Sequence, residues 1–460
     1  MVAKQYKKSS LLLKAASLLL MSSLSLAEPT KDYFSDNNST VYQNKTNSSN
    51  LNASNPLIRV NSFDLSRLKD IPEYAIISDE LDSIVKADQK ENNNRYSIVR
   101  LELLADKLSL YYRKKGLILT KVYFPPQNLK NKTLYIDLVM GKIEQVLVSK
   151  NELYSNERLM RPFKELLDKP AFIPSLESSL IEINKYPGVN IATRFKEGDA
   201  IGTSKIDILV KEENMTDFNF SFDNYGSEYT GSMRGTLNAN FYNITDHADR
   251  LSINALATFN PTNSVYLGAN YGFKLAPYYS NSSLNSIFRH GVNVTFGYQE
   301  TQYTVGGDFE ELNYKGKANT SYIKLDKDLI LRNSHRLNTN IKLSKKLAQT
   351  SSDKETVDNN LSIFSWGTTL GWNDFFGSPS ANILHFEYHK GLPGFAGAME
   401  NNDEEIARSG TEQQKAPMDF TRYNLTISRN QRVGPYQLVT RLTSQYTADL
   451  LLPSEQSSLG

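Results

Sequence analysis

The feature that most constrains this chain is a long series of alternating segments in its C-terminal half. In Thr216–Gly231, Phe218, Phe220 and Phe222 fall on one face of an extended strand, because successive side chains of a strand point to opposite faces. Segments of about ten residues with one apolar and one polar face are typical of a transmembrane β-barrel. A soluble β-sandwich also alternates, but with shorter strands. We therefore predict an outer-membrane β-barrel over residues 214–460.

The alternation predicts eleven barrel strands. They lie near residues 216–224, 231–242, 249–260, 263–275, 290–301, 315–326, 335–347, 358–373, 381–390, 418–430 and 434–447. If the first strand runs outward, the longest connections follow odd-numbered strands and most short ones follow even-numbered strands, which is the outer-membrane pattern. The connection 276–289 is an exception, because it is long and falls on the predicted periplasmic side.

The N-terminus has the pattern of a secretory signal peptide. A lysine-rich start is followed by the apolar stretch Leu11–Leu20 and by Ser25–Ala27, a small-x-small cleavage site. A membrane anchor helix is disfavoured, because the apolar stretch is short and contains Lys14. We predict a signal peptide over residues 1–27, and no other segment has the 18 or so consecutive apolar residues of a membrane-spanning helix.

Three further regions precede the predicted barrel. Residues 28–56 are rich in Asn, Ser and Thr, which predicts a disordered linker. Residues 57–141 and 142–213 each have apolar patterns in the order strand, helix, helix, strand, strand. In the first of these units Gly116 follows the second helix, where a left-handed cap is expected. Two units of one topology indicate an internal repeat of α+β modules.

The motifs of these units carry a resemblance to a known family. Tyr112–Gly116, followed by Val122–Leu129 and Leu134–Ile143, resembles the POTRA domain of two-partner secretion transporters. These are the outer-membrane proteins that export large haemolysins and filamentous haemagglutinins, also called haemolysin secretion-activation proteins. Pro187–Val189 and Glu197–Thr203 are similar to the second POTRA domain of that family. The resemblance implies POTRA domain 1 over residues 57–141 and POTRA domain 2 over 142–213, both in the periplasm of a Gram-negative bacterium.

The resemblance extends into the barrel and has some departures. Asp223–Gly226 and Tyr229–Gly231 are similar to the start of the family's sixteen-stranded barrel. Met140 stands where an acidic residue is usual before Gly141, and Asn131–Lys132 replaces a usual glycine turn. Neither departure touches the apolar pattern of the predicted core.

The last residues resemble the start of the family's long sixth extracellular loop. Leu451–Gln456, continuing through Leu459–Gly460, precedes the point where that loop folds into the pore with its Arg-Gly-aromatic motif. We therefore expect a chain truncated at its C-terminus, with the last five strands missing. Such a sheet has two unpaired edges, which lipid does not tolerate, so this polypeptide is expected not to export a protein by itself.

The resemblance implies a transporter that exports, or exports and activates, a large secreted partner protein without nucleotide hydrolysis. An extended passenger segment would add to a POTRA sheet edge or lie in the adjacent groove. The groove is placed between the helix that ends at Tyr112 and the strand Leu117–Phe124. The candidate partner-binding residues are Tyr112, Gly116, Thr120, Lys121, Val122 and Phe124. For Tyr112 and Phe124, ordinary core packing is favoured over direct contact.

Other chemistries have little support. The charge is balanced, with 52 Lys and Arg against 50 Asp and Glu, so no nucleic-acid partner is expected. Cysteine is absent, and His385 and His389 would lie about 13 Å apart on a strand, so neither metal nor cofactor is expected. We expect a monomer in outer-membrane lipid and no enzyme. The alternatives are a barrel-assembly factor, which generally has more POTRA units, and a diffusion porin, which has none.

Overall fold

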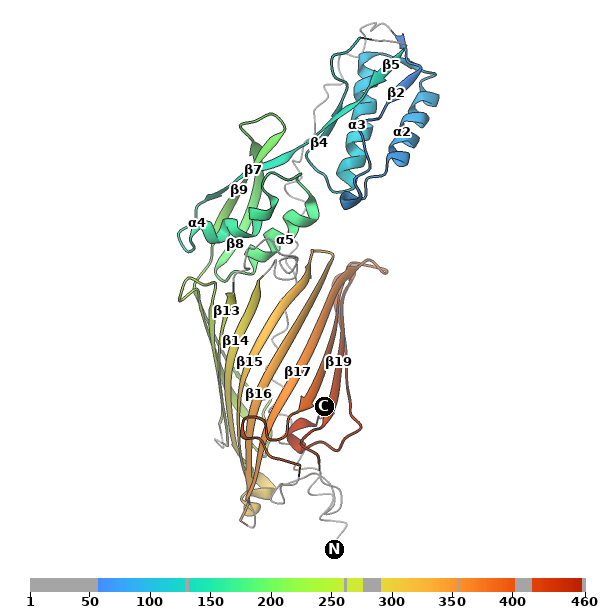
Figure 1. Ribbon diagram of the computed structural model, residues 1–460. Coiled ribbons are helices and arrows are strands. Elements are labelled where there is room, and N and C mark those ends of the chain that lie inside the picture. Colours follow the sequence, from blue (N-terminus) through green and yellow to red (C-terminus); the bar gives the residue numbers. More distant parts are fainter. Residues whose placement is uncertain are drawn as a thin grey trace.

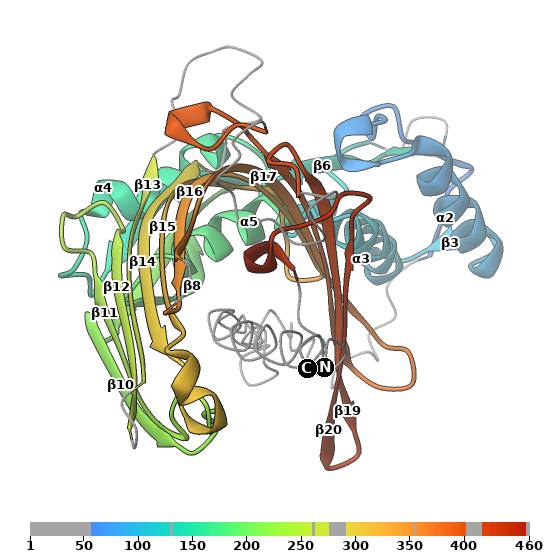
Figure 2. The same ribbon diagram turned by 90° about the horizontal axis from the view of Figure 1, so that it is seen from below.

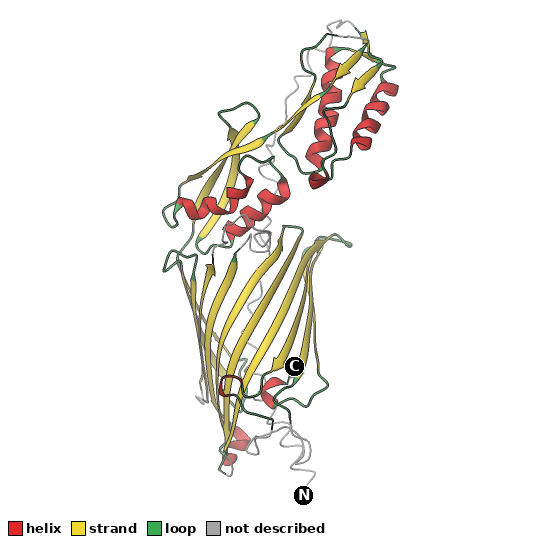
Figure 3. Ribbon diagram, viewed as in Figure 1, coloured by secondary structure: helices red, strands yellow, loops and turns green. Residues whose placement is uncertain are grey.

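The computed structural model describes residues 57–128, 132–259, 263–275, 291–353, 356–401 and 416–456. Two small α+β units lie above one end of a large curved sheet (Figure 1). Helices are concentrated in the two units, whereas the sheet carries only short helical turns in its connections (Figure 3). The predicted signal peptide, the predicted linker and the connection 276–289 lie outside the described residues.

No helix within the described ranges is both long enough and apolar enough to cross a membrane.

The first unit has the predicted order of elements. They are β1 (Ile58–Arg59), β2 (Ser62–Asp64), η1 (Pro72–Tyr74), α2 (Ser78–Glu91), β3 (Arg95–Tyr96), α3 (Ile98–Lys114), β4 (Thr120–Tyr123), β5 (Thr133–Tyr135) and β6 (Asp137–Met140). The Ser97 hydroxyl caps α3 by accepting from the Arg100 N–H. Buried side chains of α3, among them Leu104 and Leu108, pack into one core with Leu81 of α2. β2 pairs with β5 in parallel, and β4 pairs with β6 antiparallel.

Several turns of the first unit have a left-handed backbone, among them those at Gly116 and Lys132. Gly116 has φ +102°, so the predicted cap after the second helix is confirmed. Lys132 has φ +55°, a conformation that glycine adopts without a steric cost. The sequence therefore replaces the usual glycine of this turn, while the backbone keeps a geometry that favours glycine.

The second unit repeats the topology over β7 to β9. Its elements are β7 (Lys142–Ser149), α4 (Asn156–Met160), η2 (Arg161–Leu166), α5 (Ile173–Asn184), β8 (Val189–Glu197) and β9 (Thr203–Glu212). The sheet order is β7-β9-β8, and a separate core lies between this sheet and the helices. The first helix of this unit, α4, changes to the 3-10 helix η2 at Arg161. Pro162 has no N–H, so the α-helical ladder cannot continue through it.

All eleven predicted barrel strands are present. They are β10 (Thr216–Asp223), β11 (Met233–Tyr242), β12 (Arg250–Phe259), β13 (Ser264–Leu275), β14 (Val292–Thr304), β15 (Lys315–Leu331), β16 (His335–Ser351), β17 (Thr356–Asp374), β18 (Ser380–Gly391), β19 (Thr421–Val433) and β20 (Tyr436–Tyr446). They form one sheet in chain order, and every neighbouring pair is antiparallel. β10 and β20 are the two edges of this sheet, as predicted, and they do not pair with each other.

The two faces of the sheet differ in polarity. Phe218, Phe220 and Phe222 are exposed on the convex face, where Leu343 also lies. The concave face carries charged side chains such as Lys346. Seen along the strands, the sheet curves around an interior into which the segment η5 (Pro453–Glu455) projects (Figure 2). This is the outward-apolar, inward-polar arrangement of a membrane barrel wall.

Helix α5 fixes the second unit to the rim of the sheet. The Ser178 hydroxyl donates to the Leu331 carbonyl at 2.8 Å, and the Lys274 ammonium lies 2.9 Å from the Glu182 carboxylate. Both members of this ion pair are nearly buried. In Figure 1, α5 accordingly lies directly above the ends of the central strands. The second unit therefore stands at the mouth of the space that the sheet encloses.

Candidate functional site

Four of the six predicted partner-binding residues, Tyr112, Gly116, Thr120 and Val122, are buried in the first unit. Tyr112 has no exposed surface, and its ring meets the Tyr111 ring edge-on at 5.7 Å. Burial raises the pKa of the Tyr112 hydroxyl to about 12, and this hydroxyl has no hydrogen-bond partner among the described residues. Thr120 and Val122 are also buried. These three side chains cannot touch a partner unless the unit opens.

Gly116 lies at the junction between the two units. Its carbonyl accepts from the Ile173 N–H at 2.9 Å, which ties the end of α3 to the start of α5. A Cβ at this position would stand 2.8 Å from the Phe172 ring, closer than side chains normally approach. The absence of a side chain at Gly116 therefore serves the contact between the units.

Of the six predicted residues, Lys121 and Phe124 are the two that are not buried. Lys121 is exposed on β4, and Phe124 is half-buried beside the Phe63 ring at 5.9 Å. The first unit thus offers a passenger one cation and part of one aromatic ring at the predicted positions.

The outer edge of β4 is already hydrogen-bonded within the first unit. In an antiparallel pair, alternate residues direct both backbone groups away from the partner strand. On β4 these residues are Thr120, whose N–H donates to the Leu117 carbonyl at 3.2 Å, and Val122, whose N–H donates to the Ser109 hydroxyl at 2.8 Å. A passenger strand would find no donor on this edge of β4.

The corresponding strand of the second unit, β8, has an open edge. Ile191 donates to the Asn184 side chain at 2.9 Å, so odd-numbered residues of β8 direct their backbone groups away from β9. Further along the strand these residues include Thr193 and Phe195, and the whole run from Ala192 to Glu197 is exposed. Within the described residues no strand pairs with this side of β8.

Sequence reasoning placed the site on β4 and did not identify β8. One signal was available, since Pro125 and Pro126 follow the predicted strand Leu117–Phe124, whereas β8 contains no proline. Proline disrupts a strand ladder, so proline content separates the two edges.

A buried carboxylate anchors the polar face of β8. Asp207 of β9 has no exposed surface, and it accepts from Arg194 and Lys196 of β8, both at 2.8 Å, and from the Ser149 hydroxyl at 2.9 Å. The Lys196 ammonium, aided by Ser149 and Arg194, lowers the pKa of Asp207 to about 2. These bonds strengthen the attachment of β8 to β9 and leave the other edge of β8 accessible.

The concave face of the sheet holds a second polar cluster. Glu455, nearly buried, accepts from Lys346 at 3.0 Å and from Arg422 at 2.8 Å. This pairing fixes η5 inside the curve of the sheet (Figure 2). The segment that resembles the start of the sixth extracellular loop therefore contacts the inner wall.

His385 and His389 lie on β18 on either side of Glu387. Their Nε2 atoms are 3.4 and 3.5 Å from the Glu387 carboxylate, and their Nδ1 atoms are each 2.8 Å from a threonine or serine hydroxyl. Such distances are those of weak ion pairs and hydrogen bonds. Across the part of the chain that the structure describes, no three His, Cys, Asp or Glu side chains form a group that could hold a metal ion.

Comparison with protein-family models gives two matches. Residues 202–460 match the model described as haemolysin secretion/activation protein ShlB/FhaC/HecB, which is more than half of the chain. Residues 78–141 match the model of the ShlB-type POTRA domain. The two models thus cover most of the first unit and the whole sheet.

Curated relatives and solved structures agree with these matches. The heme/hemopexin transporter protein HuxB of Haemophilus influenzae strain 86-028NP is 23% identical over 358 residues, 77% of this chain and 60% of the relative. A second HuxB of Haemophilus influenzae is 24% identical over 363 residues, again 60% of its length. The chain therefore spans about 60% of the length of the curated relatives it matches.

Two solved structures share the fold. CdiB from Escherichia coli has a TM-score of 0.66 at 18% identity, covering 88% of this chain and 71% of that one. CdiB from Acinetobacter baumannii has a TM-score of 0.54 at 16% identity, covering 87% and 70%. At these identities the likeness concerns the fold alone, namely small α+β units followed by a large antiparallel sheet.

Proposed function

The chain belongs to the haemolysin secretion/activation family, and on that premise we propose that it is the outer-membrane transporter of a two-partner secretion system. Members of this family are outer-membrane β-barrels with periplasmic POTRA domains, so the sheet lies in the outer membrane and the two units in the periplasm. The cargo is a large secreted protein that passes through the space enclosed by the sheet. We assign the chain no catalytic role.

One observation carries this proposal: a pair of POTRA-like units fixed to the rim of a membrane sheet. The second unit is bound to the sheet through α5, so a segment captured there is already at the mouth of the enclosed space. The match to the secretion family favours a transporter over a barrel-assembly factor. The two periplasmic units are also unlike a diffusion porin, which has none.

We place capture of the passenger on both units, with different contacts. On the second unit an extended passenger segment would pair with the outward backbone groups of Thr193 and Phe195 on β8, in the manner of β-strand addition. On the first unit the edge is closed, so the passenger would lie in the groove and touch the side chains of Lys121 and Phe124. No nucleotide is needed in this scheme, because the passenger is bound and moved onward only through its contacts with the transporter.

Site-specific crosslinking in cells tests this proposal. A photo-crosslinker at Phe195 should trap the large secreted protein encoded by the neighbouring reading frame, and one at Lys121 should trap it less efficiently. Thr120 is buried and therefore unsuitable for a crosslinker. Lys86 of α2 is exposed and serves as the control position. Crosslinks from Lys86 alone, or none from either strand, would reject both capture sites.

A further inference from the structure

On β14, β15 and β16, side chains on the convex face of the sheet change from apolar to polar within one step along the strands. Phe296, Ile323 and Leu343 are cross-strand neighbours on β14, β15 and β16. The next outward-facing row, farther from the periplasmic units, contains Tyr298, Ser321, Lys345 and Ser362. In a barrel wall this change marks the border between the acyl chains of the outer leaflet and its headgroups.

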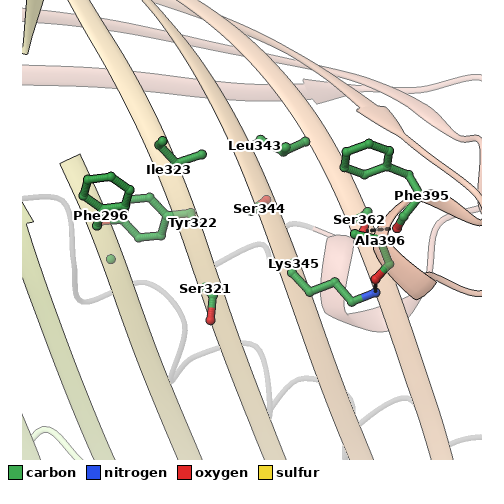
Figure 4. A pocket seen from close by; sticks show the side chains of 11 residues that line it. Phe296, Ser321, Tyr322, Ile323, Leu343, Ser344, Lys345, Ser362, Phe395 and Ala396 are labelled. Atoms are coloured by element: carbon green, nitrogen blue, oxygen red, sulfur yellow. Dashed lines mark hydrogen bonds between the residues drawn. The ribbon is translucent and has the colours of Figure 1, made fainter. Parts of the chain in front are cut away.

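A pocket of about 340 Å³ lies across this border (Figure 4). Its apolar end is formed by Ile323 and Leu343, with the Phe296 ring on one side and Phe395 on the other. Its opposite end holds Lys345. The pocket is therefore apolar toward the middle of the membrane and cationic toward the outside.

One wall of the pocket comes from the connection after β18. The segment η4 (Phe395–Gly397) crosses the outer surface of the sheet, where it is held by three hydrogen bonds. Lys345 donates to the Ala396 carbonyl at 2.8 Å, Ser362 to the Phe395 carbonyl at 2.7 Å, and Asn360 to the Gly397 carbonyl at 2.7 Å. The wall is thus fixed by the same polar row that borders the pocket.

We infer that this pocket binds one acyl chain of an anionic outer-leaflet lipid, with the lipid's phosphate at the Lys345 ammonium. An ammonium has three N–H donors, and Lys345 gives one to Ala396, so donors remain for phosphate. Within the described ranges Lys345 forms no ion pair, whereas Lys317 on the same face is paired with Glu300 at 3.2 Å. An unpaired cation beside an apolar pocket in the membrane wall matches an anionic headgroup above an acyl chain.

The size of the pocket fits a single chain. A water molecule's share of liquid volume is about 30 Å³, and a methylene group is of similar size, so the pocket corresponds to roughly eleven such groups. The inference depends on the membrane placement of the sheet and is independent of passenger transport.

Lipid titration of the purified chain tests the inference. Binding of phosphatidylglycerol and of phosphatidylcholine with the same acyl chains is measured by native mass spectrometry in detergent, without any passenger. The anionic lipid should bind about fivefold more tightly, the preference expected of one lysine near a membrane surface. Lys345→Gln should abolish this preference, Lys345→Arg should retain it, and Lys317→Gln should leave it unchanged.

A second variant and a competitor separate the acyl chain from the phosphate. Leu343→Trp fills the pocket and should weaken binding of both lipids, while the folded sheet is verified by its circular dichroism. Inorganic phosphate alone should not displace phosphatidylglycerol. Displacement by inorganic phosphate would assign the site to free phosphate, and an unchanged lipid preference in Lys345→Gln or unchanged affinity in Leu343→Trp would overturn the inference.

Discussion

The two periplasmic units share one order of elements but differ in the outer edge of one strand, which is hydrogen-bonded in the first unit and exposed in the second. In the first unit, β4 has four residues, and both outward N–H groups are bound, one by the Leu117 carbonyl and one by the Ser109 hydroxyl. In the second unit, β8 has nine residues and an exposed edge from Ala192 to Glu197. The same topology thus contains a closed edge and an open one.

The difference shows that the topology alone does not define a docking strand. An exposed edge invites pairing with another chain, and proteins normally block such edges. In the first unit, Ser109 of α3 and the two prolines after β4, Pro125 and Pro126, block the edge of β4. The open β8 edge lies on the unit that is fixed to the rim of the sheet, where strand addition would deliver a passenger to the enclosed space.

The largest expected effect on passenger capture comes from closing the β8 edge. Thr193→Pro combined with Phe195→Pro removes two outward N–H groups while sparing the ladder to β9, since proline is tolerated where the N–H faces away from the partner strand. Two lost hydrogen bonds at about 0.7 kcal/mol each predict about tenfold weaker capture of the passenger. The crosslinking yield of the passenger measures the effect.

The matched control keeps the backbone donors. Thr193→Ala combined with Phe195→Ala retains both N–H groups and removes only the side chains. If the proline and alanine variants capture the passenger equally well, strand addition to β8 is rejected, and side chains alone account for binding.

Opening the β4 edge is the reverse experiment. Ser109→Ala removes the acceptor of the Val122 N–H, and a buried donor left without a partner costs about 1–3 kcal/mol. Hydrogen exchange at Val122 should become faster, and crosslinking from Lys121 should rise because a donor is now available. Ser83→Ala is the control, since Ser83 also donates to the carbonyl four residues before it but accepts no strand N–H. Unchanged exchange at Val122 would show that the serine does not close this edge.

Much of this architecture follows from local patterns, but the state of the strand edges does not. Alternation identifies all eleven sheet strands, because the direction of a side chain depends only on its position along the strand. Whether the N–H of Val122 or of Thr193 is free depends on the pairing register and on a helix residue distant in sequence. The lipid-facing pocket depends likewise on η4, a loop segment whose path across β16 and β17 has no periodic signal.

The buried anchor of β8 predicts a pH dependence of the second unit. The pKa of Asp207 is about 2 in the folded chain, below the value near 3.9 of an unfolded aspartate, so its ion pairs stabilise the second unit above about pH 4. This stabilisation decreases as the pH falls through the folded pKa. Because Arg194 and Lys196 are about half exposed, we expect about 1–2 kcal/mol.

Hydrogen exchange of β8 and β9 between pH 5 and pH 2 checks this dependence. Asp207→Asn should lower the protection at pH 5 and remove most of its decrease toward pH 2. Asp199→Asn is the control, because Asp199 pairs with Lys205 at the exposed turn and is itself exposed. If both variants behave alike, burial of Asp207 does not anchor β8.

The smallest effect distinguishes core packing from partner contact in the first unit. Tyr112→Phe removes a buried hydroxyl that has no partner among the described residues, so the free energy of unfolding should stay the same or rise by up to about 1 kcal/mol. Tyr96→Phe is the matched control, because the Tyr96 hydroxyl donates to Asp88 at 3.1 Å and its loss should destabilise the unit. Hydrogen exchange of α3 reports both changes. Weaker passenger capture by Tyr112→Phe, with stability unchanged, would show that the first unit opens during capture, since Tyr112 cannot otherwise be reached.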